Sequence, residues 1–179
     1  MGSVPPDVAT TVCADEILAL MKLTGKNGLA NADITLLSAG TKFGATVTDY
    51  LKDRYRIETV NTFGPNNNQQ RRQKMGFFMG DARIKATTLH SFKGWEGRLL
   101  VVHIAHATDA TALALIYAGL TRLKRHVEGS SLTVVCSHSA NELESFGRKW
   151  PSFDQKDYGI ASYAPHESKL AYVSVQEAK

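Results

Sequence analysis

The sequence contains little cysteine: Cys13 and Cys136 are the only two among 179 residues, and each lies in apolar surroundings. Two distant thiols favour buried free cysteines over a disulfide framework, and they suit a reducing compartment. The six histidines are scattered, and the closest pair, His103 and His106, has no third ligand nearby. A structural zinc site needs about four ligands at close spacing. The sequence therefore predicts no metal site of its own and a cytoplasmic location.

Long hydrophobic runs are also missing. The longest largely apolar stretch, residues 112–120, is far shorter than the roughly 20 residues that span a membrane. The N-terminus lacks the basic, then apolar, then small-residue pattern of a signal peptide. We therefore expect no membrane partner. Residues 1–3 resemble a cloning remnant.

A phosphate-binding loop of the form G-x-x-x-x-G-K-[S/T] is absent as well. The only Gly-Lys pair is Gly25-Lys26, and Leu20 and Asn27 stand where the motif needs glycine and a hydroxyl. No serine lies in a G-x-S-x-G elbow. The chain alone should therefore turn over no ATP.

The charge balance is mildly basic, with a net charge of +4. This permits binding to a polyanion but does not require it. The basic residues gather in the middle of the chain, at Arg71, Arg72, Lys74, Arg83, Lys85, Lys93, Arg98, Arg122, Lys124 and Arg125. Any one of these groups is most often a solvated face.

Hydrophobic periodicity predicts alternating strands and helices. We expect helices at 11–23, 41–55 and 111–125, and strands at 32–40, 56–60, 82–90, 97–106 and 130–137. The order predicts a mainly parallel sheet with right-handed crossovers. Residues 61–81 are expected to form a loop with at most a short helix, and 140–150 a short helix before an irregular tail. The apolar stripe of the helix at 111–125 comprises Leu113, Ile116, Tyr117, Leu120 and Leu123.

The segment "TTLHSFKGWEG", residues 87–97, gathers the side chains of a site for phosphate and sugar. Gly94 allows close backbone approach, Lys93 supplies charge, and Glu96 can accept hydrogen bonds from hydroxyls. Taken alone, the segment slightly favours the interpretation as a polar turn between two strands.

Together with "LIYAGLTRLKR", residues 115–125, this segment resembles two signature motifs of the UvrD/Rep-type superfamily 1 helicases. Those motifs read T-x-H-x-x-K-G-L-E and Y-V-[AG]-x-T-R, and the resemblance covers about residues 30 to 138. Trp95 replaces the usual leucine, and the N-Y-R-S/T segment that usually begins the domain has no counterpart.

The resemblance implies an α/β fold, a RecA-like three-layer sandwich with a mainly parallel sheet flanked by helices. It implies the C-terminal domain of an ATP-dependent DNA helicase, with residues 4–150 as the domain and 151–179 as an extension. The implied roles are an arginine finger at Arg122, nucleotide binding by Gly94, Glu96 and Arg122, and nucleic-acid binding by Thr88, His90, Ser91 and Lys93.

The implied cofactors are ATP and Mg²⁺, with the Mg²⁺ ligands on a missing N-terminal domain. The implied partners are single-stranded DNA and an N-terminal RecA-like domain, in cis or in trans. The alternative is a stand-alone, non-catalytic RecA-like module that binds nucleic acid or a protein.

Overall fold

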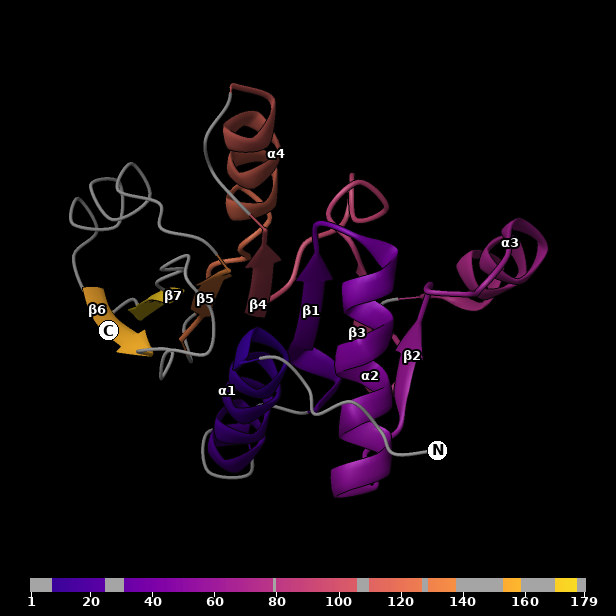
Figure 1. Cartoon of the computed structure of the whole chain (residues 1–179), viewed down its shortest axis with the longest axis horizontal. Helices are drawn as coiled ribbons and strands as arrows, with labels where there is room; N and C mark the ends of the chain where they lie inside the picture. Colours follow the sequence, from indigo (N-terminus) through magenta and orange to yellow (C-terminus); the bar gives the residue numbers. More distant parts are fainter. Residues whose placement is uncertain are drawn as a thin grey trace, which may run out of the picture.

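The structure is a computed structural model that describes residues 8–24, 31–78, 80–105, 110–126, 129–137, 153–158 and 170–176. Its elements run along the chain in an order that alternates helices and strands (Figure 1). In sequence they are α1 (Val8–Thr24), the 3₁₀ turn η1 (Asn31–Asp33), β1 (Ile34–Ser38), α2 (Thr41–Tyr55), β2 (Thr59–Asn61), α3 (Asn67–Gly76), β3 (Ile84–Thr88), β4 (Leu99–Ile104), α4 (Ala110–Leu120), β5 (Ser131–Cys136), β6 (Phe153–Tyr158) and β7 (Leu170–Gln176).

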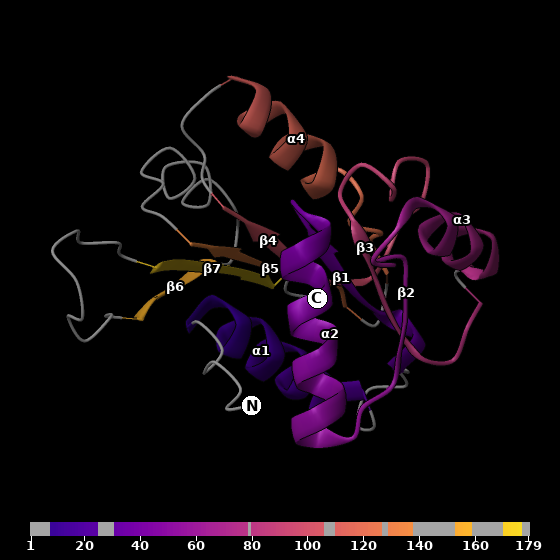
Figure 2. The same cartoon turned by 45° about the vertical axis from the view of Figure 1, so that its right-hand side comes forward.

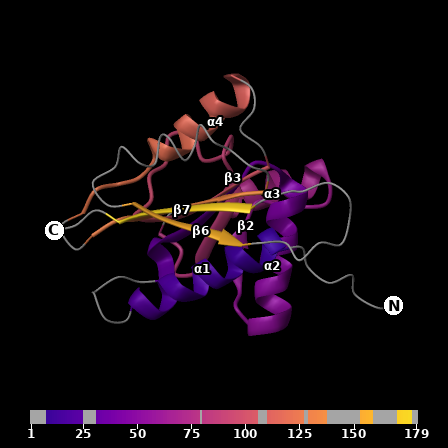
Figure 3. The ribbon, with the colours of Figure 1, turned by 60° about the vertical axis from the view of Figure 1, so that its left-hand side comes forward.

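The strands form one sheet in the order β2-β3-β1-β4-β5-β7-β6. Strands β1 to β5 are mutually parallel, whereas β7 pairs antiparallel with both β5 and β6. Helices α1 and α2 lie on one face of the sheet and α4 on the other (Figure 3). The predicted α/β three-layer sandwich with a mainly parallel sheet is therefore confirmed.

The core consists of two apolar clusters, one on each face of the sheet. Successive residues of a strand point to opposite faces. Thus Leu36 packs in the cluster with Ile17 of α1 and Val47 of α2, while Leu37 packs in the cluster with Leu120 of α4. Because both faces are covered, β1 and β4 are buried along their whole length, as is typical of parallel strands.

Most predicted elements occur close to their expected places, but two segments contain more regular structure than expected. Residues 61–81, expected to form a loop with at most a short helix, contain the ten-residue helix α3. None of its side chains is buried, so apolar periodicity could not reveal it. The Asn66 side chain caps it by accepting a hydrogen bond from the Gln69 amide at 2.9 Å.

The tail expected to be irregular contains β6 and β7, which extend the sheet beyond β5. The domain boundary near residue 150 stays a prediction. The helix expected at 140–150 lies outside the described residues.

The apolar stripe predicted for α4 is also wrong in part. Leu120 is buried, but Leu113 is 36% exposed and Tyr117 is 62% exposed. The Ile116 side chain lies outside the described residues. Figure 1 shows the reason: α4 rises beyond the ends of the strands, and its C-terminal end approaches the sheet.

Lys85 connects the segments that precede β1 and β3 at the amino edge of the sheet. Its side chain is fully buried on β3, and its ammonium donates hydrogen bonds to the carbonyl oxygens of Ala32 and Asp81. Burial lowers the pKa of Lys85. Asp81 itself accepts hydrogen bonds from the Arg83 side chain, which hold the pKa of the Asp81 carboxyl well below its usual range.

The described helices include none that is both long enough and apolar enough to cross a bilayer.

Candidate functional site at the carboxyl edge of the sheet

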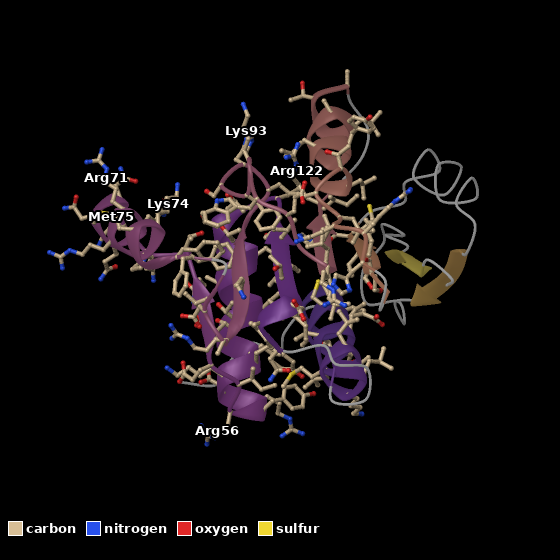
Figure 4. All side chains as sticks on the ribbon, turned by 180° about the vertical axis from the view of Figure 1, so that it is seen from behind. Arg56, Arg71, Lys74, Met75, Lys93 and Arg122 are labelled. Carbon is tan, nitrogen blue, oxygen red and sulfur yellow. The ribbon has the colours of Figure 1, made fainter. Side chains whose placement is uncertain are left out.

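The carboxyl ends of five parallel strands meet at one edge of the sheet, where open α/β folds usually bind their ligands. In Figure 4 the labelled Lys74, Lys93 and Arg122 lie toward this edge, with Arg71 on the same side of the molecule. Arg56 lies at the opposite end. Arg71, Lys74, Lys93 and Arg122 are spread over about fifty residues of sequence. The fold brings them to a common edge.

The turn after β3 carries most of the predicted site residues. At the start of this segment the side chain of Thr88 bonds to Ser91. The Thr88 hydroxyl accepts a hydrogen bond from the Ser91 amide at 3.2 Å and donates one to the Ser91 hydroxyl at 3.0 Å. Gly94 has φ of 88°, a left-handed conformation that favours glycine. His90 and Lys93 are exposed. Threonine and glycine at these positions are thus accounted for by the geometry of the turn.

The same turn is joined to the end of α4. The Gly97 amide donates a hydrogen bond of 3.0 Å to the Arg122 carbonyl oxygen, and the Lys124 amide donates one of 2.8 Å to the Gly97 carbonyl oxygen. The Arg122 guanidinium donates through Nε to the Ala118 carbonyl oxygen at 3.3 Å. The backbone segments that carry Glu96 and Arg122 are therefore neighbours.

A pocket of about 340 Å³ opens where β2 and β3 end. Its hydroxyl groups come from the residue after β2, from β3 and from the turn after β3, its cation from α3, and its aromatic rings from the two loops. The lining residues are Thr62, Lys74, Phe77, Thr87, His90, Ser91 and Trp95. We call this the β2/β3 pocket.

Two contacts give the β2/β3 pocket a defined shape. The hydroxyls of Thr62 and Thr87 lie 2.7 Å apart and form a hydrogen bond. The rings of Phe77 and Trp95 are 6.4 Å apart between centroids and nearly perpendicular, at 88°. One polar wall and one aromatic wall therefore face a common space.

Of the predicted site residues, His90 and Ser91 line this pocket, whereas Thr88 shapes the turn beside it. Lys93, Gly94, Glu96 and Arg122 are not among its lining residues. Their assigned roles, including the catalytic role of Arg122, stay predictions.

Sequence reasoning missed Thr62, Lys74 and Phe77, and it treated Trp95 as a change in packing. The first three residues belong to the segment between β2 and β3, which was expected to be mainly loop. Their position after a predicted parallel strand could have indicated these residues, because a polar segment that directly follows such a strand lies at the edge where ligands usually bind.

A second pocket of about 470 Å³ lies at the first turn of α3, which stands off the sheet beyond β2 (Figure 2). It is lined by Asn66, Asn67, Asn68, Gln69 and Arg72. Its lining comes from a single exposed turn of chain, and no strand end contributes to it. The β2/β3 pocket, built from three separate segments, is therefore the stronger candidate.

The switch point of the sheet lies between β1 and β4, where such folds often bind nucleotides. Here the ring of Phe43, from α2, stacks on His103 of β4 at 3.4 Å between centroids and an angle of 11°. His103 Nε2 forms a hydrogen bond of 2.8 Å with the Ser137 hydroxyl. Two stacked rings therefore occupy this part of the carboxyl edge.

Comparison with known proteins shows a fold similarity only. No protein-family model matches the chain, and no curated protein matches it. The N-methyltransferase NodS from Bradyrhizobium japonicum, solved with S-adenosyl-L-homocysteine, has a TM-score of 0.54 at 13% identity, over 98% of this chain and 90% of that chain.

An uncharacterized protein from Listeria monocytogenes serotype 4b has a TM-score of 0.50 at 10% identity, over 97% of this chain and 69% of that chain. The magnesium protoporphyrin IX methyltransferase from Synechocystis PCC 6803 has a TM-score of 0.47 at 9% identity, over 99% of this chain and 90% of that chain.

The assignment to the UvrD/Rep-type helicases is wrong. NodS, with a TM-score of 0.54, is an N-methyltransferase, and its similarity extends over 98% of this chain, beyond the residues that resembled helicase motifs. The assigned helicase function is therefore wrong, and so are the labels helicase, ATP-binding and hydrolase and the DNA binding expected of a helicase domain. The partner that the resemblance implied, single-stranded DNA, stays a prediction. The stand-alone RecA-like module has no specific support either.

ATP and Mg²⁺ as cofactors are likewise incorrect, because the NodS structure holds S-adenosyl-L-homocysteine. The physical reason for the error is local. Thr88 and Gly94 shape a tight turn after a strand, and at Gly119 an added Cβ would lie 2.4 Å from the end of the Leu89 side chain, which would have to shift. Different α/β folds can share such turns.

The residues present do not fit an S-adenosyl group either. Nucleosides in such folds are held by a glycine-rich turn after the first strand and by a carboxylate on the ribose. Here β1 ends at Ser38, and the residues that follow it, Ala39 and Gly40, include one glycine. The Ser38 hydroxyl donates a hydrogen bond to the Gly40 carbonyl oxygen at 2.7 Å and accepts one from the Gly40 amide at 3.2 Å. The described residues that immediately follow β1, β2 and β3 include no carboxylate, and the first carboxylate in the turn after β3, Glu96, comes eight residues beyond the strand. The comparisons thus show an α/β fold of the Rossmann-like type.

Proposed function

We propose that the protein binds single-stranded nucleic acid at the carboxyl edge of its sheet. The observation that carries the proposal is the β2/β3 pocket, which combines hydroxyls, a cation and an aromatic side chain in one space. The proposal rests on the chemistry of this pocket and on the basic residues around it, not on family membership.

Phosphate oxygens are usually bound by lysine, arginine and hydroxyl side chains. Lys74, His90 and Ser91 provide such donors in the pocket. Arg71 on α3 and Lys93 in the turn after β3 are both exposed near the same edge. A nucleic-acid backbone that crosses this edge would therefore meet positive charge on either side of the pocket.

The size and shape of the site favour a single strand over a duplex. About 340 Å³ is at the small end of ligand pockets, which usually measure about 300–1,000 Å³. Bases can be stacked on aromatic side chains only where they are splayed from their neighbours, as in single strands. The pocket is thus suited to one nucleotide unit of a longer chain.

Fluorescence anisotropy with labelled oligothymidylate and oligouridylate, each of about 12 nucleotides, tests the proposal. Lys74→Ala should weaken binding roughly fivefold to tenfold and reduce the dependence of log K on log salt by about one unit. The expected loss is similar for both oligomers because the contact is to phosphate.

Arg56→Asn is the matched control, because it also removes one positive charge but at the opposite edge. Arg56 has φ of 59°, and asparagine tolerates that conformation. Equal losses in the two variants would show that net charge alone governs binding, and would overturn the proposed site.

A further inference from the structure

We infer that Trp95 is a stacking platform for one unstacked base, so that the β2/β3 pocket binds base and phosphate through different walls. The inference rests on the proposed function and adds the part of the ligand that the aromatic wall recognises.

Trp95 is placed where a base could reach it. It is 38% exposed and lines the β2/β3 pocket together with His90 and Ser91. The contact with Phe77 is perpendicular, at 88°, so Phe77 can cover at most one face of the indole. At least one face therefore stays clear of Phe77.

The backbone around Trp95 fixes its position. Its amide donates a hydrogen bond of 3.0 Å to the Phe92 carbonyl oxygen, and Phe92 is itself almost fully buried. Gly94, directly before it, turns the chain through a left-handed conformation. The aromatic partner Phe77 is also buried. A rigid ring loses little conformational freedom when a base stacks on it.

Apart from Trp95 and Phe77, the residues that line the pocket are polar. Ser91, His90 and Lys74 can approach the phosphate that follows the stacked base. Stacking is tolerant of base identity because every base has a π-face. The geometry therefore points to binding that a base strengthens but that does not depend on which base it is.

Removing the base while keeping every phosphate tests this division. Trp95 and Trp150 are the only tryptophans, so Trp150→Phe leaves Trp95 as the single reporter. Oligothymidylate should quench Trp95 fluorescence and bind roughly tenfold tighter than an abasic oligomer of the same length and charge. The abasic oligomer should bind without quenching.

Variants of Trp95 and Lys74 distinguish base stacking from phosphate binding. In the chain with its native Trp150, Trp95→Phe should keep the preference for the base-bearing oligomer, measured by anisotropy. Trp95→Ala should abolish that preference while leaving the affinity for the abasic oligomer unchanged. Lys74→Ala should weaken both oligomers by the same factor. Circular dichroism checks that each variant is folded.

The outcomes are distinct. Equal affinity of the parent protein for the two oligomers, or a preference that survives Trp95→Ala, would overturn the stacking role and leave the phosphate site standing. If neither oligomer binds, the proposed function fails and the stacking role fails with it.

Discussion

The hydroxyl of Thr62, just after β2, lies 2.7 Å from the hydroxyl of Thr87 on β3, and both threonines line the β2/β3 pocket. Both side chains are buried. This hydrogen bond therefore joins the end of the edge strand to its neighbour and sets the width of the pocket at its base.

Because the two hydroxyls satisfy each other, replacing one should cost more than replacing both. Thr62→Val or Thr87→Val leaves a buried hydroxyl without its partner, and each should lower the free energy of unfolding by about 1–2 kcal/mol. The free energy of unfolding of the double variant should be no lower than that of the less stable single variant. Urea denaturation of the four proteins gives the coupling energy, and additive losses would contradict the pairing.

Gly94 should tolerate little besides glycine, although a Cβ there would meet nothing within 4 Å. Its φ of 88° makes Gly94→Ala unfavourable by about 1–2 kcal/mol, with Gly94→Asn less affected. Gly76→Ala is the matched control, since its surroundings are equally open and its φ is ordinary. Thermal or urea unfolding measures the difference; similar losses at the two positions would rule out conformational strain as the cause.

Lys85 should make stability increase with pH in the alkaline range. Its folded pKa is lowered by burial from the ordinary value of 10.5, so the unfolded chain binds more protons between the two values. The free energy of unfolding should therefore rise as pH approaches 10.5, and this rise should vanish in Lys85→Met. Lys52→Met, at an exposed position on α2, is the control that should retain it. A parallel pH profile for wild type and Lys85→Met would refute the burial effect.

S-adenosylhomocysteine should not bind, even though the fold resembles that of a protein solved with it. Phe43 and His103 are stacked at the switch point, and the described strand ends there offer no carboxylate for a ribose. Isothermal titration at millimolar ligand should show no binding to the wild type or to Phe43→Ala. Saturable binding to the wild type would contradict this prediction. Binding to Phe43→Ala alone would mean that the ring is the sole obstacle.

Several elements of the fold could be predicted from the sequence because their side chains face the core. Strand β1 and helix α2 carry apolar residues at the spacing of their own geometry, and both were found close to their expected limits. Helix α3 was missed because all of its side chains lie outside the core. The stripe of α4 was misjudged at Leu113 and Tyr117, because periodicity does not tell how much of a helix reaches the sheet.

The candidate site was predictable only in part. The helicase resemblance named His90 and Ser91, and both line the β2/β3 pocket, but their binding role stays a prediction. Lys74 and Phe77 were not identified, because their proximity to the turn after β3 depends on β2 pairing with β3 rather than on any local pattern.

By itself, the sequence determined the class of the fold and the local shape of its turns. Alternating apolar runs require a buried parallel sheet between helices, and Gly94 and Thr88 dictate how the chain leaves β3. The order of the strands was decided only in the tertiary structure, since many orders bury the same residues equally well. That order brings Thr62, Lys74 and Trp95 into one pocket and stacks Phe43 on His103 at the switch point. Short motifs record local turn geometry, whereas a binding site depends on which strand ends are neighbours.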